Sequence, residues 1–481
     1  MPRLKVLFVV SECVPFAKTG GLGDVAGALP IALAERGHDV RIVLPRYRSA
    51  AKHPARRLPA PLAVPVGTGE AWCAVWETRL AKSRARVYLL EQNDLFDRAG
   101  IYADPGGDYG DNLARFTFLS RGALKLCTYL DFVPDVIHVH DWPTALIPVH
   151  LNSTERGTPL GQAATVLTIH NLGYQGWFDK GELPVTGIGW EQFNAWSLEC
   201  FDRINLLKGG IYHATIVSTV SPTYAVEIQT TEGGHGLDGA LRDRGRDVIG
   251  ILNGIDDKVW DPSSSPHLPA HYSAEDLRGK AVCKAALQRE MGLAERPDVP
   301  LFGIISRLAH QKGIDIFAGA LERILAMDVQ VVLLGSGEAW AEDLFGRLHR
   351  TSDRFRAHLG MSEPLAHRIE AGADFFLMPS RYEPCGLNQL YSQRYGTLPI
   401  VRAVGGLEDT VEHLRTGYKF TDLSPAALAE TAELAARIYR TDPARHRQMQ
   451  VSGMMKPMGW EHASRQYEAL YRMAVARRRR R

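Results

Sequence analysis

Short apolar runs alternate along the chain with segments in which apolar residues recur at helical spacing. Val25, Leu29 and Leu33 lie on one such segment, which ends before Gly37, a residue type common just after the last turn of a helix. Several of the short runs are rich in β-branched residues and lack polar alternation, as strands buried on both faces do. We therefore predict parallel strands, joined by helices, at 5–10, 40–44, 86–90, 136–140, 163–169, 215–220 and 248–252.

The same alternation continues in the second half of the chain. It predicts strands at 300–305, 330–334, 375–378 and 398–401. A polar, proline-containing stretch at 256–271 separates the halves, and we place the domain junction just before it, near Asn253. The pattern therefore predicts an α/β protein of two Rossmann-like, doubly wound domains, 1–252 and 253–459, that face a deep cleft.

The composition excludes several classes of protein. The chain has 481 residues, of which 45% are hydrophobic and 23% are charged, as in ordinary globular proteins. No run of about 18 apolar residues is present to cross a membrane, and a net charge of +2 gives no basis for nucleic-acid binding. The six cysteines lack zinc-binding spacing, and the apolar run at 6–10 is too short for a secretory signal. We expect a cytoplasmic protein with free thiols and no membrane partner.

A glycine-rich loop follows the first predicted strand. Three glycines within 20–23 precede a helix, where unpaired backbone N–H groups and the helix dipole favour an anion such as phosphate. Lys18 adds a positive charge beside them. The pattern GxGxxA at 21–26 also fits a dinucleotide fingerprint, but it lies far from the strand end, and Pro45-Arg46 stands where a ribose-binding acid is needed. Turn glycines without any ligand are the remaining alternative.

Polar side chains follow two further strands of the first half. His138-Val139-His140-Asp141-Trp142 ends one strand, and Thr168-Ile169-His170-Asn171 ends the next. Because the carboxyl ends of parallel strands meet at one edge of a sheet, these residues can hold sugar hydroxyls, and Trp142 can cover a sugar ring. No third ligand at metal-binding spacing accompanies His138 and His140, so we interpret both as core histidines.

The second half carries candidate cations and a candidate carboxylate. Arg307 and Lys312 follow its first strand and suit a diphosphate, with a solvated pair of surface charges as the alternative. Glu383 stands on a turn, Glu383-Pro384-Cys385-Gly386-Leu387, ahead of a helix. No Asp-x-Asp sequence occurs, so the common carboxylate pair for a magnesium diphosphate is missing and protein cations must neutralise a leaving phosphate. We predict no metal and no cofactor.

Six motifs, taken in order, resemble those of the glycogen and starch synthase family. They are Lys18-Thr-Gly-Gly-Leu-Gly-Asp24, His138-Val-His-Asp-Trp142, Thr168-Ile-His-Asn171, Gly250-Ile-Leu-Asn-Gly-Ile-Asp256, Ser306-Arg307 with Gln311-Lys312-Gly313, and Glu383-Pro-Cys-Gly-Leu387. The resemblance covers nearly the whole chain. It implies a retaining glycosyltransferase of the GT-B architecture that moves glucose from ADP-glucose to the non-reducing end of an α-1,4-glucan primer such as glycogen, releasing ADP without a metal.

The resemblance also implies roles for individual residues. The catalytic residues are Glu383, His170, Lys18, Arg307 and Lys312. Those that bind the nucleotide sugar are Lys18, Gly20, Gly21, Asp24, Asn253, Arg307, Lys312, Met361, Cys385, Gly386 and Leu387. Those on the sugar and acceptor side are Glu12, Tyr109, Asp141, Trp142 and Asn171. A C-terminal helix at about 460–476 is expected to complete the first domain, and the arginine tail, 477–481, to be disordered.

Two alternatives to this function stay open. Met361 stands where the family usually has an aromatic residue that stacks on adenine, which leaves room for a retaining transferase that uses a UDP-sugar. An inactive relative that only binds glucan is the other, although all five implied catalytic residues are present. The sequence also leaves open whether Glu383 orients the donor or acts on it directly.

Overall fold

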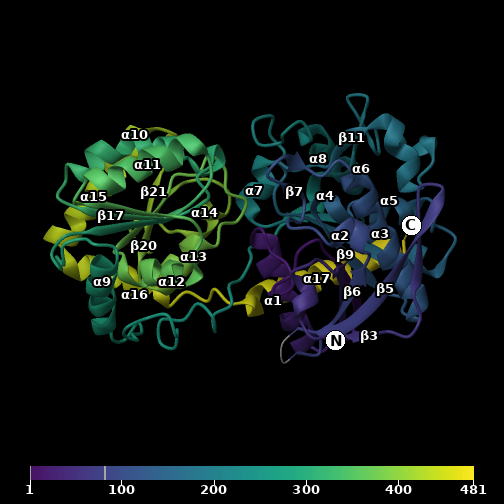
Figure 1. Cartoon of the computed structure of the whole chain (residues 1–481), viewed down its shortest axis with the longest axis horizontal. Helices are drawn as coiled ribbons and strands as arrows, with labels where there is room; N and C mark the ends of the chain where they lie inside the picture. Colours follow the sequence, from purple (N-terminus) through teal and green to yellow (C-terminus); the bar gives the residue numbers. More distant parts are fainter. Residues whose placement is uncertain (1, 81–82, 481) are drawn as a thin grey trace. The chain divides into compact units, whose positions relative to one another are not determined.

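The computed structural model describes residues 2–80 and 83–480. The chain divides into two compact units, which we call unit 1 (Met1–Gly254 with Trp460–Arg481) and unit 2 (Ile255–Gly459). The first division lies two residues beyond the expected junction, and the second coincides with the start of the expected C-terminal helix. Figure 1 shows the elements of each unit.

Unit 1 is built on a ten-stranded sheet in the order β15-β14-β10-β9-β1-β2-β6-β5-β3, with β4 paired to β5. Its seven parallel strands are those predicted, namely β1 (Lys5–Val9), β2 (Asp39–Pro45), β6 (Arg86–Glu91), β9 (Val136–His140), β10 (Ala164–Ile169), β14 (Ile216–Thr219) and β15 (Val248–Gly250). Three antiparallel strands were not predicted, β3 (Arg56–Arg57), β4 (Leu62–Val66) and β5 (Gly69–Arg79). Small sheets form from β7 (Ala103–Asp104) with β8 (Gly107–Asp108), and from β11 (Trp177–Asp179), β12 (Glu199–Cys200) and β13 (Arg203–Asn205).

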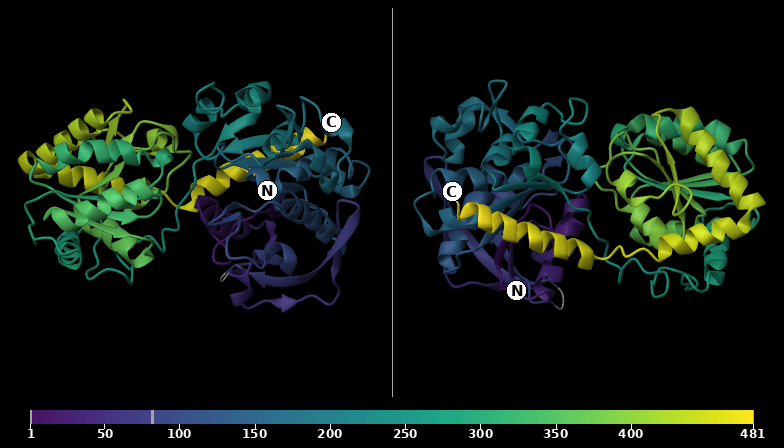
Figure 2. Two further views of the ribbon diagram at one scale, coloured as in Figure 1. Left: turned by 45° about the horizontal axis from the view of Figure 1, so that its top comes forward. Right: turned by 180° about the vertical axis from the view of Figure 1, so that it is seen from behind.

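Helices cover both faces of this sheet because its strands are apolar on both sides. Leu7 and Val9 of β1 belong to one hydrophobic cluster, with α3 (Asn112–Tyr129), α5 (Leu146–Asn152) and α6 (Leu206–His213). Val6 and Phe8 point to the other face and pack with α1 (Gly21–Glu35) and α17 (Trp460–Arg478). Figure 2 shows α17 lying along unit 1, to which the C-terminal helix belongs.

The expectation of a disordered arginine tail is wrong for its described part. Helix α17 continues to Arg478, and the backbone N–H of Arg479 and Arg480 also make helical-type hydrogen bonds. The Arg477 guanidinium pairs with Asp247, and that of Arg478 donates to Asn152 Oδ1 and to the Gly161 carbonyl. The tail is ordered because these acceptors lie within reach of the last helical turn. Residue 481 lies outside the described residues.

Unit 2 contains a six-stranded parallel sheet in the order β18-β17-β16-β19-β20-β21. The predicted strands are β16 (Leu301–Ile305), β17 (Gln330–Gly335), β19 (Phe375–Met378) and β20 (Leu398–Arg402), and the edge strands β18 (Phe355–Leu359) and β21 (Tyr418–Phe420) are additional. Figure 1 shows α10 (Ile314–Leu325), α11 (Ala339–Thr351) and α15 (Pro425–Thr441) on one face, and α9 (Arg278–Glu290), α12 (Glu363–Gly372), α13 (Asn388–Arg394) and α16 (Pro443–Met454) on the other. Val331 and Val332 of β17 enter different hydrophobic clusters accordingly.

Both units are therefore α/β structures with doubly wound parallel sheets, as predicted. Among the helices within 2–80 and 83–480, none has the length and hydrophobicity that crossing a bilayer requires.

Candidate active site

Several of the implied site residues follow the carboxyl ends of strands that flank a reversal of strand order, among them Lys18 after β1, Asp141 after β9, Arg307 after β16 and Glu383 after β19. In unit 1, β1 lies between β2 and β9, so the loops after β1 and β9 run in opposite directions. In unit 2, β16 lies between β17 and β19 in the same way. A doubly wound sheet binds ligands beside such a reversal. The candidate site therefore consists of one group of residues in each unit.

The glycine loop of unit 1 is organised around the carboxylate of Glu12. Glu12 Oε2 accepts hydrogen bonds from the backbone N–H of Thr19 (2.6 Å) and Gly20 (3.0 Å), and Oε1 accepts from Thr19 Oγ1 (2.7 Å). Tyr102 OH donates a further bond to Oε1 (2.8 Å). The N–H groups of Thr19 and Gly20 are therefore not unpaired as expected, because a buried protein carboxylate accepts from both, while anion binding by this loop stays a prediction.

Lys18 and Asp24 form an ion pair at the start of α1. The Lys18 Nζ lies 2.7 Å from Asp24 Oδ1, and half of the Lys18 side chain is exposed. An exposed pair of this kind contributes at most about 1 kcal/mol, so an incoming phosphate can replace Asp24 as the partner of Lys18 at low cost. The two implied donor-binding residues are thus adjacent, with Lys18 able to turn toward a ligand.

The ends of β9 and β10 meet through the side chain of Asp141. Its Oδ1 accepts a hydrogen bond from the backbone N–H of His170 (2.7 Å) and a longer one from Asn171 (3.4 Å). The pKa of Asp141 is raised to about 7, chiefly by burial and to a smaller extent by the nearby charge of Glu12, while the two backbone hydrogen bonds oppose the rise. Asp141 also adopts a positive φ of 53°, a strained conformation for a residue with a side chain. These contacts bring Glu12, Asp141, His170 and Asn171 into one region.

His170 is a neutral imidazole that pairs with a second histidine. Its Nε2 lies 3.0 Å from Nδ1 of His140, the last residue of β9. Burial lowers the pKa of His170 to about 3 and holds that of His140 well below its ordinary value. His138 is buried as predicted, with hydrogen bonds to Thr168 Oγ1 (2.6 Å) and Tyr471 OH (2.8 Å). The sequence indicated core histidines at 138 and 140, but it gave no sign of the contact between His140 and His170.

Trp142 and Tyr109 lie in aromatic surroundings. The Trp142 ring contacts Phe116 edge-on at a centroid distance of 4.8 Å, and it remains half-buried. Tyr109 is held by the guanidinium groups of Arg98 and Arg115, which lie 4.7 Å and 4.9 Å from its ring centroid. Trp142 is thus packed beside Asp141, whereas the described contacts of Tyr109 are to residues outside the predicted set. Tyr102, which binds Glu12, was missed because no motif marks it.

In unit 2, the candidate carboxylate and one candidate cation are paired with each other. The Lys312 Nζ lies 2.9 Å from Oε1 and 2.7 Å from Oε2 of Glu383. Ser380 Oγ donates a third bond to Oε2 (3.0 Å). The Glu383 side chain is 7% exposed and that of Lys312 is 23% exposed. Ser380 was not predicted, although it lies three residues before Glu383.

Glycines allow the two loops of unit 2 to approach one another. Gly313, directly after Lys312, has a φ of +66°, and a Cβ there would lie 1.9 Å from the Pro379 carbonyl oxygen. Gly406 comes equally close to the Glu383 turn, since its Cβ would lie 2.1 Å from the Cys385 carbonyl oxygen. Any side chain at either position would push the Lys312 loop or the Glu383 turn away.

Arg307 is the accessible cation of this group. Its side chain is exposed and makes one long hydrogen bond, 3.4 Å, to Gln311 Oε1. An anion that reaches this edge of the unit 2 sheet therefore finds Arg307 without a carboxylate partner within the described ion pairs. Lys312 contributes a second positive charge, which Glu383 balances.

The remaining implied donor-binding residues are distributed over both units. In unit 1, Asn253 is buried, and its Oδ1 has no hydrogen-bond partner among the described residues. In unit 2, Gly386 adopts a φ of +70° before α13, Cys385 is buried and Met361 is 78% exposed on the turn that joins β18 to α12. Within the described ranges, no group of three His, Cys, Asp or Glu side chains is placed to hold a metal ion, and the six cysteines are buried with no disulfide among them.

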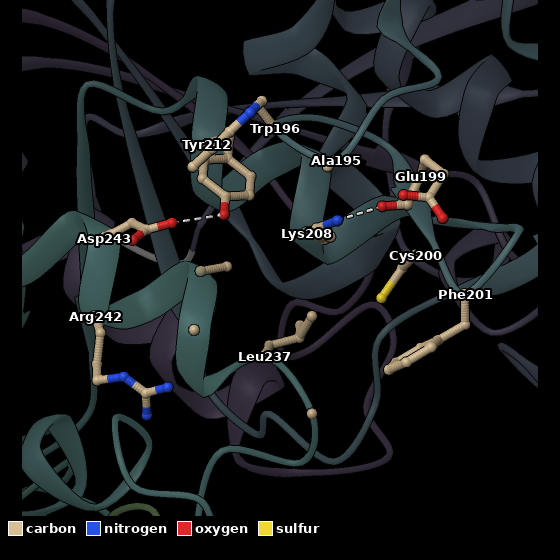
Figure 3. Close-up of a pocket in the computed structure, with 13 residues that line it drawn as sticks. Ala195, Trp196, Glu199, Cys200, Phe201, Lys208, Tyr212, Leu237, Arg242 and Asp243 are labelled. Carbon is tan, nitrogen blue, oxygen red and sulfur yellow. Dashed lines mark hydrogen bonds between the residues drawn. The ribbon is translucent and has the colours of Figure 1, made fainter.

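A pocket elsewhere in unit 1 contains none of the predicted site residues (Figure 3). It encloses about 450 Å³ between the 195–212 segment and α8 (Asp238–Arg244). Its polar groups bind one another, since Tyr212 OH donates to Asp243 (2.9 Å) and Lys208 donates to the Glu199 carbonyl. The pocket is therefore separate from the strand-end residues described above.

Comparison with known proteins covers nearly the whole chain. Residues 5–243 match the family described as "Starch synthase catalytic domain", and residues 299–436 match "Glycosyl transferases group 1". The chain is 50% identical to Glycogen synthase 1 of Geobacter metallireducens, over 99% of this chain and 97% of the relative. It is 52% identical to Glycogen synthase of Anaeromyxobacter dehalogenans, over 98% and 99%.

Solved structures give the same relationship. The catalytic domain of Starch Synthase IV from Arabidopsis thaliana, bound to ADP and acarbose, superposes with a TM-score of 0.92 at 33% identity, over 99% of this chain and 100% of that one. Sucrose-phosphate synthase from Thermosynechococcus elongatus is similar in fold, with a TM-score of 0.60 at 19% identity over 98% of this chain.

Proposed function

Because the chain belongs to the glycogen and starch synthase family, we propose that it transfers glucose from ADP-glucose to the non-reducing end of an α-1,4-glucan. The chain is a hexosyltransferase of the GT-B fold class. In the proposed reaction the bond between the anomeric carbon and the diphosphate breaks, a glucan hydroxyl bonds to that carbon with retention of configuration, and ADP leaves.

The observation that carries the proposal is the arrangement of Arg307, Lys312 and Glu383 in unit 2. Negative charge develops on the diphosphate as the sugar bond breaks, and fixed cations stabilise it most strongly where water is excluded. Arg307 is free to pair with that charge, while the Lys312 Nζ is held in place by both oxygens of Glu383. We propose that these two cations replace a metal ion, so that no cofactor is required.

Glu383 is better suited to orienting groups than to attacking the sugar. Both of its oxygens accept hydrogen bonds from Lys312, and one also accepts from Ser380. A carboxylate engaged in this way is a poor nucleophile but a well-fixed acceptor. We propose that Glu383 positions Lys312 and accepts from a donor hydroxyl.

Unit 1 is proposed to bind the sugar and the acceptor. Neutral His170, Asn171 and Asp141 lie together and offer hydrogen-bond donors and acceptors to hydroxyl groups. Trp142, half-buried beside them, offers a ring to a sugar, and Lys18 can pair with a phosphate in place of Asp24. The six buried cysteines form no disulfide with one another, which fits a reducing compartment, so we propose that the enzyme acts in the cytoplasm.

The test is a donor comparison with glycogen as primer. Purified protein is incubated with ADP-glucose or UDP-glucose, with and without EDTA, and release of nucleoside diphosphate and extension of the glucan are both measured. We expect ADP release that matches glucan extension, is faster than with UDP-glucose and is unaffected by EDTA. Faster turnover with UDP-glucose would overturn the donor assignment. Absence of turnover with both donors would overturn the proposed reaction and favour a relative that only binds glucan.

A further inference from the structure

His140 and His170 form a hydrogen bond between their imidazole rings, so just one of the two facing nitrogens carries a proton. The strands that carry them are neighbours, with Thr168 of β10 opposite His140 of β9. Nδ1 of His140 and Nε2 of His170 lie 3.0 Å apart, so one nitrogen must donate and the other must accept. Both rings are neutral, because burial lowers both pKa values.

The far nitrogen of His140 decides between the two arrangements. Nε2 of His140 is buried and has no hydrogen-bond partner among the described residues. If His170 donated, this nitrogen would carry a buried N–H without an acceptor. If His140 donates through Nδ1, the buried nitrogen is a bare acceptor instead. Buried N–H groups without partners are rarer in proteins than buried acceptors without partners, so the second arrangement is favoured.

The His140 ring is fixed in this orientation by its surroundings. It stacks on Phe8 at a centroid distance of 5.6 Å with an interplanar angle of 19°, and the His138 ring lies 4.1 Å away. Its backbone N–H donates to Thr144 Oγ1 (2.7 Å). His138 is in turn bonded to Tyr471 of α17. A rotation of the His140 ring would therefore disturb its packing against Phe8 and His138.

We propose that His140 is a positioning residue that donates a hydrogen bond to Nε2 of His170 and thereby places the proton of His170 on Nδ1. Among the described residues, the hydrogen bond of the His170 ring is the one through Nε2, so the N–H on Nδ1 is available to a sugar hydroxyl. The functional part of this inference rests on the proposed transfer reaction, whereas the tautomer itself does not. Fixing a histidine tautomer through its second nitrogen is a general means of preparing a ring for one role.

The tautomer can be read directly by NMR on the full chain labelled with ¹⁵N-histidine. Long-range ¹H–¹⁵N spectra at neutral pH distinguish protonated from bare ring nitrogens, and His170→Asn identifies the signals of His170. We expect His170 to carry its proton on Nδ1 in the unmodified protein, and to shift toward the Nε2–H form in His140→Leu. A proton on Nε2 of His170 in the unmodified protein would overturn the proposal, whether or not the protein transfers glucose.

Kinetics then separate positioning from a structural effect. We expect His140→Leu to lower kcat about tenfold, the loss of one well-placed hydrogen bond, with the KM for ADP-glucose within about twofold of its original value. His140→Asn keeps a donor near the position of Nδ1 and should recover kcat to within about threefold. Equal losses in both variants, or an unchanged kcat in His140→Leu, would contradict the proposal. If His140→Leu does not fold, the proposal is still tested by the kcat of His140→Asn and by the His170 tautomer in the spectrum of the unmodified protein.

Discussion

The ammonium group of Lys312 contacts both carboxylate oxygens of Glu383, each within 2.9 Å. The two residues are 71 positions apart in the sequence, and they meet because β16 and β19 are neighbours in the sheet of unit 2. The carboxylate thus determines where the cation lies before any ligand binds.

Removal of this carboxylate should abolish most of the activity without unfolding unit 2. In Glu383→Ala, Lys312 loses its fixed partner and the proposed acceptor for a donor hydroxyl disappears. We expect initial rates of ADP release to fall at least about 100-fold, with little change in far-UV circular dichroism. Glu430→Ala, at an exposed carboxylate of the same unit, is the matched control and should keep full activity. Substantial turnover in Glu383→Ala would mean that the reacting centre lies elsewhere.

The Glu12 carboxylate should matter for the order of the glycine loop. In Glu12→Gln, one side-chain oxygen must replace two that together accept from Thr19, Gly20 and Tyr102. We expect the free energy of unfolding to fall by about 1 kcal/mol and the KM for ADP-glucose to rise. Hydrogen exchange of the Thr19 and Gly20 amides should accelerate.

Tyr102→Phe is the control for this prediction, because it removes one donor to Glu12 and leaves the loop bonds in place. Its amide exchange at Thr19 and Gly20 should stay close to that of the unmodified protein. Unchanged exchange in Glu12→Gln would show that the carboxylate does not hold the loop.

Asp141 should make the stability of the protein depend on pH in a direction set by its raised pKa. Its pKa rises from 3.8 to about 7 in the folded protein, so the folded state holds a proton that the unfolded state releases. The contribution of Asp141 to stability is therefore present below about pH 4 and is lost as the pH rises through about 7.

Asp141→Asn tests this sign because an amide keeps the acceptor for the His170 N–H but cannot ionise. We expect the variant to gain stability relative to the unmodified protein as the pH increases from 4 to 8, measured by urea unfolding at each pH. A difference in stability that stays constant over this range would show that Asp141 does not titrate there.

Strands that are buried on both faces of a sheet could be predicted from the sequence, whereas strands with one exposed face could not. All five residues of β9 are buried, and three of them are Val or Ile, so 136–140 is typical of a strand buried on both faces. In strand β5, Cys73 and Val75 are the buried residues and Trp72 is 60% exposed. The strand joins the sheet as an antiparallel addition, which the βαβ rhythm does not predict. Strand β18 was missed for a similar reason, since Arg356 and His358 interrupt its apolar character.

The candidate site could be predicted as a set of residues but not as a set of contacts. The motifs name Glu12, Lys18, Asp24, Lys312 and Glu383, yet they do not show that Glu12 occupies the loop amides or that Lys312 binds Glu383. Such pairings depend on which strands become neighbours and on glycines that permit close approach, as at Gly313. The role of His140 could not be predicted for the same reason. A buried histidine is interpreted as a core residue until its hydrogen-bond partner on the neighbouring strand is known.

Met361 offers the sharpest test of nucleotide preference. It is 78% exposed beside Gly360, at the position where the family resemblance implies an aromatic residue. A thioether covers a base less effectively than a ring, so Met361→Tyr should lower the KM for ADP-glucose several-fold and leave kcat nearly unchanged. Met455→Tyr, at another exposed methionine of unit 2 (66% exposed), is the matched control and should change neither constant. An equal gain with UDP-glucose would show that a ring at this turn does not select adenine over uracil, and no gain with either donor would show that this turn does not contact the base.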